Sequence, residues 1–131
     1  MAPLRILIAD DNAMIRKLLC ELLESEPGWT VCGEAVNGED AIEKAAELRP
    51  DVLLLDMSMP RVDGWQACRM LRAKVPATKI VLVTEQDFDL MKRATMGSGA
   101  HGFVVKSQLF SALKPAVTTA SRQDPSRSDD F

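Results

Sequence analysis

The chain has few cysteines, one histidine and no long apolar run, and each shortage argues against a class of protein. Cys20, Cys32 and Cys68 are odd in number, form no CxxC pair and lie among apolar neighbours, so we expect free thiols in a reducing compartment. His101 is the only histidine, and without a partner for a metal site it is expected on the surface, with no phosphorelay role. No segment is long enough to cross a membrane or to form the core of a signal peptide. We therefore expect a cytoplasmic protein without a membrane partner.

An excess of charge of one sign is missing as well. The chain has 16 basic and 19 acidic residues, a formal net charge of -3 and no basic block. Nucleic-acid binders carry a basic patch or stripe on one face, so we expect no direct nucleic-acid binding by this chain. Its 131 residues, 47% of them hydrophobic, are enough for one core but hardly for two. The length therefore predicts a single domain.

Five short apolar runs are present, and each is followed by a segment with apolar residues at helical spacing. The predicted strands are residues 4–9, 30–36, 52–56, 79–84 and 102–106. Strands this apolar are buried on both faces, which together with the βα alternation indicates a parallel sheet covered by helices on each side. We predict a doubly wound α/β domain of the flavodoxin-like (βα)5 class, with strand order 2-1-3-4-5. The helix residues predicted to face inward are Ile15, Leu18, Leu19, Leu22, Leu23, Ala41, Ile42, Ala45, Leu48, Ala67, Cys68, Leu71, Leu90, Met91, Ala94, Leu109, Leu113, Ala116, Val117 and Ala120.

The domain is expected to end near residue 120. Residues 1–120 are assigned to it, and residues 121–131 are polar and poor in aliphatic side chains. We expect this last segment to be a disordered tail or the start of a linker. Pro115 lies among the periodic residues of the last predicted helix, where it lacks an N–H and crowds the carbonyl four residues earlier. A kink or a break is therefore expected there.

Polar residues follow or end four of the five predicted strands. The first strand is followed by Asp10 and Asp11, the third ends at Asp56, the fourth at Thr84 and the fifth at Lys106. The carboxyl ends of parallel strands form one rim of the sheet, and the order 2-1-3-4-5 makes these four strands neighbours. The polar residues are therefore expected to converge on one crevice.

Three carboxylates in one crevice need a cation or protons, because like charges raise one another's pKa. Oxygen-only ligands, with one or two direct carboxylates plus water and a phosphoryl oxygen, favour Mg²⁺. Asp56 can then attack phosphorus and form an acyl phosphate. Lys106 would neutralise charge on the transferred group, and the Thr84 hydroxyl would donate a hydrogen bond to it. The strand ends therefore predict aspartyl-phosphate chemistry.

Four motifs carry a family resemblance: ILIADDN at the first strand, GEAVNGEDAIEKAAELRPDVLLLDMSMPRVDG through the centre, IVLVT at the fourth strand and GAHGFVVK at the fifth. In this order they resemble the receiver domain of bacterial two-component response regulators, a CheY-like family. The similarity is greatest to receivers of the NarL/LuxR-type subfamily. The resemblance covers residues 4–120.

The resemblance implies a phosphorelay signalling receiver in which Asp56 accepts a phosphoryl group from a sensor histidine kinase. Mg²⁺ would be bound by Asp11, Asp56 and the backbone carbonyl of Ser58, with Asp10 acting through water. A receiver catalyses only its own phosphorylation and autodephosphorylation, so the family implies a signalling protein rather than an enzyme with a separate substrate.

The resemblance also implies a switch made of Thr84 and Phe103. On phosphorylation the threonine hydroxyl moves to the phosphoryl group, and the aromatic ring turns inward. The surface of helix 4, strand 5 and helix 5 would then change its binding to a downstream protein partner or a fused output domain. The same surface could support a phosphorylation-dependent homodimer.

Three positions depart from the commonest pattern of the family. Ser107 stands where many receivers have a proline preceded by a cis bond, so the geometry of the peptide after Lys106 is left open. Glu85 stands where a small residue is usual, and we expect its charge to slow both entry of anionic phosphodonors and autodephosphorylation. Pro115 argues against dimers built on a straight last helix. By contrast, Asn12 and Asp63 are interpreted as structural caps.

Two other functions compete with the receiver. A Mg²⁺-dependent aspartyl-phosphate phosphatase or phosphotransferase of the haloacid dehalogenase type normally has a second aspartate two residues after the nucleophile, where this chain has Ser58. A phosphate-independent interaction module would be expected to lack one of Asp11, Asp56, Thr84 or Lys106, and none is missing. The sequence leaves open whether the chain is a stand-alone receiver or part of a longer regulator with a DNA-binding output.

Overall fold

Strands and helices alternate along the chain in the computed structural model, which describes residues 3–59, 64–85 and 99–123. The predicted strands are confirmed to within one residue at each end. The fourth predicted helix, with Leu90, Met91 and Ala94, and the predicted cap Asp63 lie outside the described residues. The elements are β1 (Leu4–Ala9), α1 (Ala13–Glu24), β2 (Trp29–Ala35), α2 (Gly38–Leu48), β3 (Val52–Asp56), α3 (Gly64–Lys74), β4 (Lys79–Thr84), β5 (Gly102–Val105), the 3₁₀-helix η1 (Lys106–Gln108) and α5 (Leu109–Ser121).

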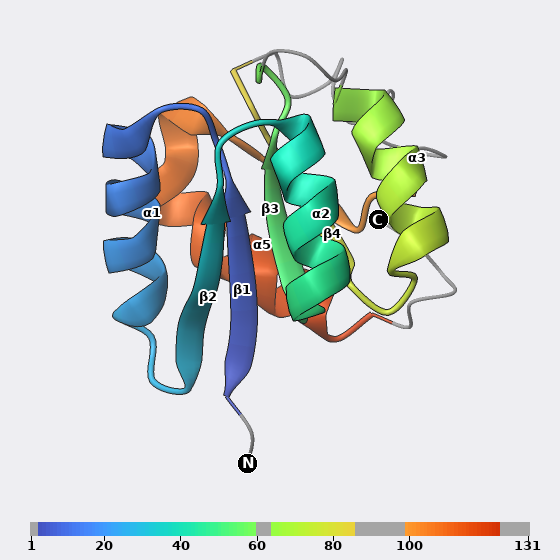
Figure 1. The fold of residues 1–131 in the computed structure, drawn as a ribbon. Coiled ribbons are helices and arrows are strands. Elements are labelled where there is room, and N and C mark those ends of the chain that lie inside the picture. The colour runs from blue at the N-terminus through green and yellow to red at the C-terminus, as the bar shows by residue number, and fades with distance from the viewer. Residues whose placement is uncertain (1–2, 60–63, 86–98, 124–131) are drawn as a thin grey trace.

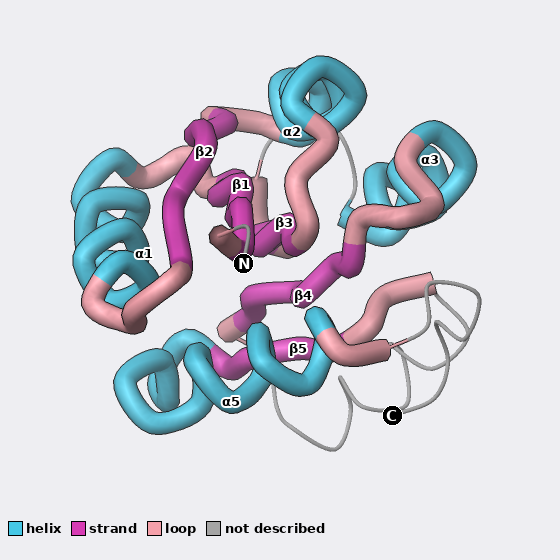
Figure 2. The backbone as a smooth tube through the Cα atoms, turned by 90° about the horizontal axis from the view of Figure 1, so that it is seen from below, coloured by secondary structure: helices cyan, strands magenta, loops and turns pink. Residues whose placement is uncertain are grey.

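The five strands form one parallel sheet in the order β2-β1-β3-β4-β5, so the predicted topology is confirmed. Of the described helices, α1 and α5 cover one face and α2 and α3 cover the other (Figure 1). The view along the strands in Figure 2 shows the same two layers on either side of the sheet. This is the doubly wound α/β arrangement, in which β1 and β3 lie at the centre and β2 and β5 at the edges.

Side chains on both faces of the sheet are buried, because alternate residues of a strand point to opposite sides. This two-sided burial explains why the strands read as continuous apolar runs. Packing on both faces also holds the central strands in place, so their carboxyl ends have fixed positions relative to one another. Residues of the strands that pack on the side of α2 and α3 include Leu7, Leu53, Leu55, Ile80 and Leu82, and those on the side of α1 and α5 include Ile6, Ile8, Val52, Leu54, Val81, Val83 and Val104.

His101 is buried rather than exposed, so the prediction of a surface histidine is wrong. Only 1% of the residue is accessible to solvent. Its ring Nδ1 accepts the N–H of Ile80 at 3.0 Å, and its own N–H donates to the Ile80 carbonyl at 2.7 Å. Its carbonyl accepts a hydrogen bond from Gln123 Nε2 at 2.8 Å. A polar ring that is bonded to the main chain in this way can be buried just before β5.

Helix α5 continues through Pro115, so of the predicted kink or break the break is wrong, and the kink stays a prediction. Pro115 lies on the exposed side of the helix, whereas Leu113 and Val117 are buried. Ser111, whose carbonyl loses its helical partner, is also exposed and can be hydrated. Packing of both halves against the sheet therefore holds the helix in one piece. The helix runs one residue past the predicted domain end, and the predicted disorder of residues 124–131 lies outside the described part.

Three smaller features complete the description. The described residues contain no cis peptide bond, so the bond between Lys106 and Ser107 is trans. The cysteines are free, with Cys68 buried and the other two half-buried. Among the described residues, the helices are all too short or too polar to cross a membrane.

Candidate functional site

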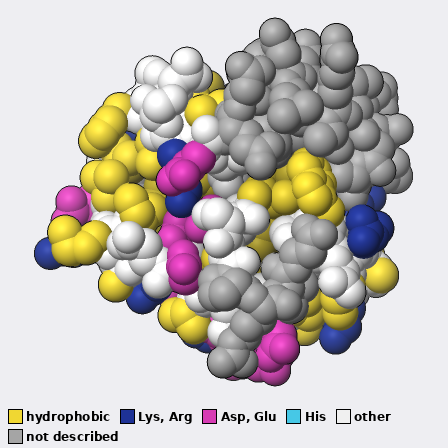
Figure 3. Space-filling model, turned by 90° about the horizontal axis from the view of Figure 1, so that it is seen from above, with side chains coloured by type: hydrophobic (Ala, Val, Ile, Leu, Met, Phe, Trp, Pro, Cys, Tyr) yellow, Lys and Arg dark blue, Asp and Glu magenta, His cyan; other side chains and the backbone are white. Residues whose placement is uncertain are grey.

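The carboxyl ends of four strands bring the predicted polar residues together. Asp10 follows β1, Asp56 ends β3, Thr84 ends β4 and Lys106 follows β5. The first three are buried, and the Lys106 side chain is 17% exposed. Figure 3 looks down on this end of the molecule, where acidic side chains gather near the middle of the face beside basic ones. The predicted convergence of strand ends is therefore present in the fold.

The turn after β1 carries two of the acids and is shaped by a cap. Asn12 is the N-cap of α1, and its side chain accepts the N–H groups of Met14 at 2.9 Å and Ile15 at 3.1 Å. Such a cap satisfies main-chain donors that the first helical turn leaves unpaired. Because Asn12 caps the helix, α1 begins at Ala13, and Asp10 and Asp11 stay in the turn at the rim of the sheet.

Asp10, Asp11 and Asp56 form a cluster of carboxylates. One oxygen from each lies within 4.8 Å of the others, with Asp11 exposed and the other two buried. All three donors are oxygens, which is the ligand type that Mg²⁺ prefers. Among the described residues, the buried carboxylate oxygens without a hydrogen-bond partner are Asp10 Oδ2 and Asp56 Oδ2. Buried carboxylate oxygens without a partner, on two residues of one cluster, fit a cation, which would satisfy both.

The two oxygens of Asp56 have different surroundings. Oδ1 accepts the Ser58 N–H at 3.1 Å and the Ser58 hydroxyl at 2.9 Å, and it lies 3.4 Å from Lys106 Nζ. Oδ2 is buried without a hydrogen-bond partner. The carboxylate is thus oriented through one oxygen, and the lone pairs of the other stay available.

Asp10 is held in a similar way. Its Oδ1 accepts the N–H of Asn12 at 2.8 Å, and its Oδ2 lies 3.6 Å from Lys106 Nζ. Burial raises the pKa of the Asp10 carboxyl above its ordinary value of 3.8, and the charge of Asp56 raises it further. The Asn12 N–H and Lys106 lower the pKa but do not cancel the rise. A divalent cation would therefore relieve a real repulsion at this site.

Lys106 supplies the positive charge opposite the acids. Burial alone lowers the pKa of its ammonium group, but Asp56 and then Asp10 raise it, and the net pKa lies above 10.5. The exposed Glu85 adds a smaller effect in the same direction. Lys106 is therefore a cation at neutral pH and can neutralise a phosphoryl group next to Asp56.

Thr84 and Phe103 lie on the same face of the sheet. Leu82 pairs with Phe103 and Thr84 pairs with Val105, and paired residues of parallel strands point to the same side. Thr84 is buried, whereas Phe103 is half-buried and packs against the core on the side of α2 and α3. The two predicted switch residues therefore lie on adjacent strands, two residues apart in register.

Two contacts of this site were not anticipated from the sequence. The hydroxyl of Ser58 bonds to Asp56, although only its backbone carbonyl had been considered. Arg16 from α1 donates to the Asp10 carbonyl at 2.8 Å. A serine two residues after a strand-end acid could have suggested the first contact. The second depends on how α1 packs, which no local pattern reveals.

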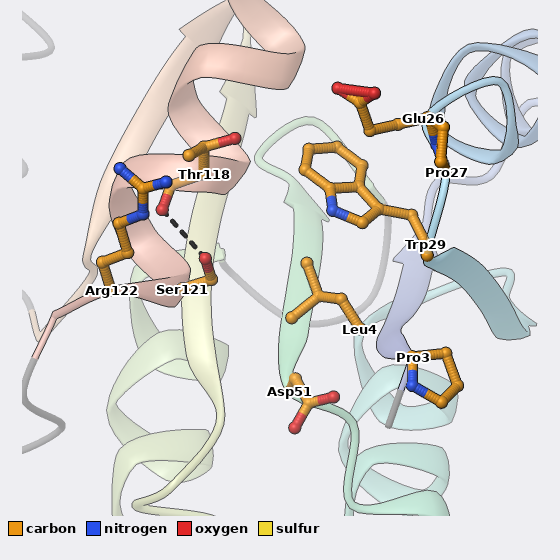
Figure 4. Close-up of a pocket in the computed structure, with 10 residues that line it drawn as sticks. Pro3, Leu4, Glu26, Pro27, Trp29, Asp51, Thr118, Ser121 and Arg122 are labelled. Carbon is orange, nitrogen blue, oxygen red and sulfur yellow. Dashed lines mark hydrogen bonds between the residues drawn. The ribbon is translucent and has the colours of Figure 1, made fainter. Parts of the chain in front are cut away.

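A separate hollow of about 780 Å³ lies at the opposite end of the sheet. Figure 4 shows Trp29 and Leu4 between Glu26 on one side and the end of α5 on the other, where the Ser121 hydroxyl donates to the Thr118 carbonyl at 2.8 Å. The hollow is lined by none of the predicted site residues. The acid cluster, rather than this hollow, is therefore the candidate functional site.

The chain is similar to known signalling proteins over most of its length. A family model described as the response regulator receiver domain matches residues 6–118. The chain is 45% identical over 107 residues to a protein-glutamate methylesterase/protein-glutamine glutaminase of Symbiobacterium thermophilum, covering 79% of this chain and 29% of that protein. It is 40% identical over 118 residues to the transcriptional regulatory protein PdtaR of Mycobacterium tuberculosis, covering 90% of this chain and 57% of that protein. The chain thus spans less than two thirds of either relative.

Solved structures with the same fold span the whole domain. The response regulator domain of Thermotoga maritima CheB has a TM-score of 0.85 and 29% identity, and the alignment covers 94% of this chain and 99% of that one. The signal receiver domain of the response regulator NarL from Mycobacterium tuberculosis has a TM-score of 0.86 and 27% identity, with 95% and 100% covered. The similarity therefore includes all four strand ends of the candidate site.

Proposed function

Since this chain belongs to the response regulator receiver domain family, we propose that Asp56 accepts a phosphoryl group from a sensor histidine kinase in a Mg²⁺-dependent reaction. The observation that carries the proposal is the state of Asp56 Oδ2, which is buried in the acid cluster without a hydrogen-bond partner while Oδ1 is fixed by Ser58 and Lys106. An oriented carboxylate with one available oxygen is suited to attack on phosphorus.

The transfer breaks one bond and forms another. A carboxylate oxygen of Asp56 attacks the phosphorus of a phosphohistidine, the P–N bond breaks, and the electron pair remains on the imidazole nitrogen, which takes a proton from water. Lys106 neutralises charge on the phosphoryl oxygens, and the Thr84 hydroxyl donates a hydrogen bond to one of them. Bound Mg²⁺ would supply further charge neutralisation. Asp11, Asp56 and the backbone carbonyl of Ser58 would hold the ion, with Asp10 acting through water.

The acyl phosphate then acts as a signal. Movement of the Thr84 hydroxyl toward the phosphoryl group leaves space that the Phe103 ring enters, because the two side chains share one face of the sheet. The surface of the fourth helix, β5 and α5 then changes its affinity for a downstream partner, an output domain or a second copy of the chain. In this proposal the protein acts in the cytoplasm and does not bind nucleic acid itself. Its only chemistry is its own phosphorylation and autodephosphorylation.

The proposal concerns the receiver unit, because the chain spans only part of its relatives. We assign that unit to residues 1–120, with residues 121–131 as a tail or the start of a linker. The esterase and the transcriptional regulation named for these relatives are not assigned to this chain. The haloacid dehalogenase alternative is not adopted, because Ser58 occupies the position of its second aspartate.

The test compares Asp56→Asn with wild type after incubation with acetyl phosphate and Mg²⁺. Intact-mass spectrometry should show one phosphoryl group on wild type and none on Asp56→Asn, and chelation of Mg²⁺ should prevent the adduct. Asp51→Asn is the matched control, because Asp51 is exposed and lies at the opposite end of the sheet. The proposal fails if wild type forms no adduct or if Asp56→Asn forms as much as wild type.

A further inference from the structure

The edge strand β2 contributes no residue to the acid cluster, but it is linked to the cluster by side-chain contacts through α1. Glu34 lies near the carboxyl end of β2, and its Oε1 accepts a hydrogen bond from Arg16 Nε at 2.9 Å. The Arg16 side chain is only 15% exposed, and that of Glu34 is 46% exposed. This ion pair therefore joins α1 to β2 in a partly shielded position, where its geometry is well defined.

The same guanidinium also holds the turn that carries the acids. Side chains of a helix lean toward its N-terminus, and Arg16 folds back so that its Nη1 donates to the Asp10 carbonyl at 2.8 Å. A guanidinium presents several donors in a rigid planar fork, so it can bond both acceptors at once. Arg16 thus bridges the turn after β1 and the end of β2.

The end of β2 is fixed from its other side as well. Lys44 of α2 donates to the Glu34 carbonyl and lies 3.3 Å from Asp40 Oδ2. The main chain adds a direct tie, because the Asp10 N–H donates to the Ala35 carbonyl at 3.0 Å. The main chain at Glu34 is therefore fixed, so the carboxylate that Arg16 contacts extends from a well-defined position on β2.

We propose that Arg16 and Glu34 form a positioning pair that fixes the direction in which the metal-binding acids point. The carbonyl held by Arg16 belongs to the peptide that links Asp10 to Asp11, so a rotation of this peptide would turn the two carboxylates apart. Arg16 bonds to a main-chain oxygen and not to a carboxylate of the cluster, which makes it a positioning residue. This inference rests on the proposed function, because it takes the cluster to be a Mg²⁺ site.

If Arg16 positions the acids, its removal should weaken Mg²⁺ binding; if it acts only through its charge, its removal should strengthen Mg²⁺ binding. Removing a cation near three carboxylates would strengthen Mg²⁺ binding by Coulomb's law. Loss of an orienting partner weakens metal binding, typically by about 10–100-fold. We expect Arg16→Met to weaken Mg²⁺ binding by about tenfold, the lower end of that range. Arg16→Lys keeps the charge but cannot bridge two acceptors in the same way, so it should also weaken binding.

Glu34 should act only through Arg16, which a double-mutant cycle can test. Glu34→Met removes the oxygen that accepts the Arg16 Nε–H, so it should weaken Mg²⁺ binding in the wild-type background and have no further effect in the Arg16→Met background. If Glu34 acted through its charge alone, its effect would be the same in both backgrounds. The cycle thus separates a mechanical link from an electrostatic one.

The measurement is the Mg²⁺ dissociation constant of each variant, obtained from the rise of the thermal unfolding midpoint with Mg²⁺ concentration in the absence of phosphodonor. Lys17→Met is the matched control, since Lys17 is the next residue of α1 and is exposed; it should bind Mg²⁺ as wild type does. The inference is overturned if folded Arg16→Met binds Mg²⁺ as tightly as wild type or more tightly, or if the Glu34→Met effect persists without Arg16. If wild type is not stabilised by Mg²⁺ at all, the proposed function fails first.

Discussion

At the residue scale, the burial of Asp10 beside Asp56 lowers the stability of the fold. Its carboxyl pKa is raised above 3.8, first by burial and then by the charge of Asp56. A raised pKa means that the folded state holds this proton more tightly than the unfolded state does. Stability is therefore lost as pH rises from 3.8 through the folded pKa, and it stays reduced above that range. At neutral pH the ionised Asp10 destabilises the metal-free fold.

Asp10→Asn should therefore stabilise the metal-free protein at neutral pH. The amide keeps an oxygen that can accept the Asn12 N–H and removes the charge, so we expect a gain on the order of 1 kcal/mol, or about 4 °C in the unfolding midpoint. The gain should shrink as pH falls through the folded pKa and vanish below 3.8, where the wild-type carboxyl is protonated in both states. Thermal unfolding in EDTA across this pH range measures it.

The same substitution should reduce the stabilisation by Mg²⁺, because it removes a carboxylate from the cluster. Asp11→Asn is a useful comparison, since Asp11 is exposed and its removal should affect metal-free stability much less. An Asp10→Asn protein that is no more stable than wild type in EDTA at pH 7 would contradict this account.

Lys106 stabilises the fold at neutral pH, in contrast to Asp10. The carboxylates of Asp56 and Asp10 raise the pKa of its ammonium group above 10.5 despite the burial of the side chain. The stability it contributes is fully present below 10.5 and is lost as pH rises through the folded pKa. One lysine thus offsets part of the repulsion among the acids over the whole neutral range.

At the element scale, His101 anchors the start of β5. The strand has four residues and lies at the edge of the sheet, where it pairs with β4 alone. His101 precedes it and exchanges two hydrogen bonds with Ile80, one through its backbone and one through its ring. Because Phe103 and Lys106 follow directly, this anchor fixes the start of the segment that carries both.

His101→Leu should destabilise the domain by about 2 kcal/mol, because it leaves the buried N–H of Ile80 without its side-chain acceptor. His101→Asn should retain most of the stability, since its Oδ1 can occupy the position of the ring Nδ1. Urea unfolding of the two variants measures the difference, and hydrogen exchange at the Ile80 amide should be faster in the leucine variant. Equal losses for the leucine and asparagine variants would contradict this account, because they would show that the acceptor at the Nδ1 position contributes little.

The elements that sequence reasoning predicted well are those fixed by local pattern. The strands are buried on both faces, so their apolar runs are unambiguous, and Asp56, Thr84 and Lys106 follow from where those runs end. His101 was misjudged because its partners are remote in the chain, 21 residues away at Ile80 and 22 at Gln123. Burial of a polar ring depends on such long-range acceptors and donors.

Two features of the helices were not predicted correctly from the sequence, and the reasons are related. The break at Pro115 was expected from local sterics, but buried residues on both sides of it hold α5 against the sheet. The sequence did not single out Arg16, because its acceptors are Glu34, 18 residues later, and the carbonyl of Asp10 in the preceding turn. Contacts of this kind depend on how an element packs, which composition and periodicity do not determine.

At the scale of the whole molecule, the candidate site extends from the central strands to the edge strand β5. The acids lie over the central strands β1 and β3, whereas Thr84, Phe103 and Lys106 belong to β4 and the β5 segment. Helix α5 packs on β5 and β4 from the side opposite to Phe103. The outer two strands therefore offer a route by which a change at the acid cluster can reach α5.

Thr84→Val tests this route, because it removes the hydroxyl and keeps the branched shape of a buried side chain. Beryllofluoride with Mg²⁺ should still form an adduct on Asp56 in this variant, since Asp56 and Lys106 are intact. In wild type the adduct should change hydrogen exchange in β5 and α5, and in Thr84→Val this change should be largely lost. Thr78→Val is the matched control, because Thr78 is equally buried but bonds to the Pro50 carbonyl at 2.7 Å; it should lower stability and keep the response. If Thr84→Val kept the full exchange response, the coupling would have to run through another part of the sheet, and the switch assigned to Thr84 and Phe103 would be wrong.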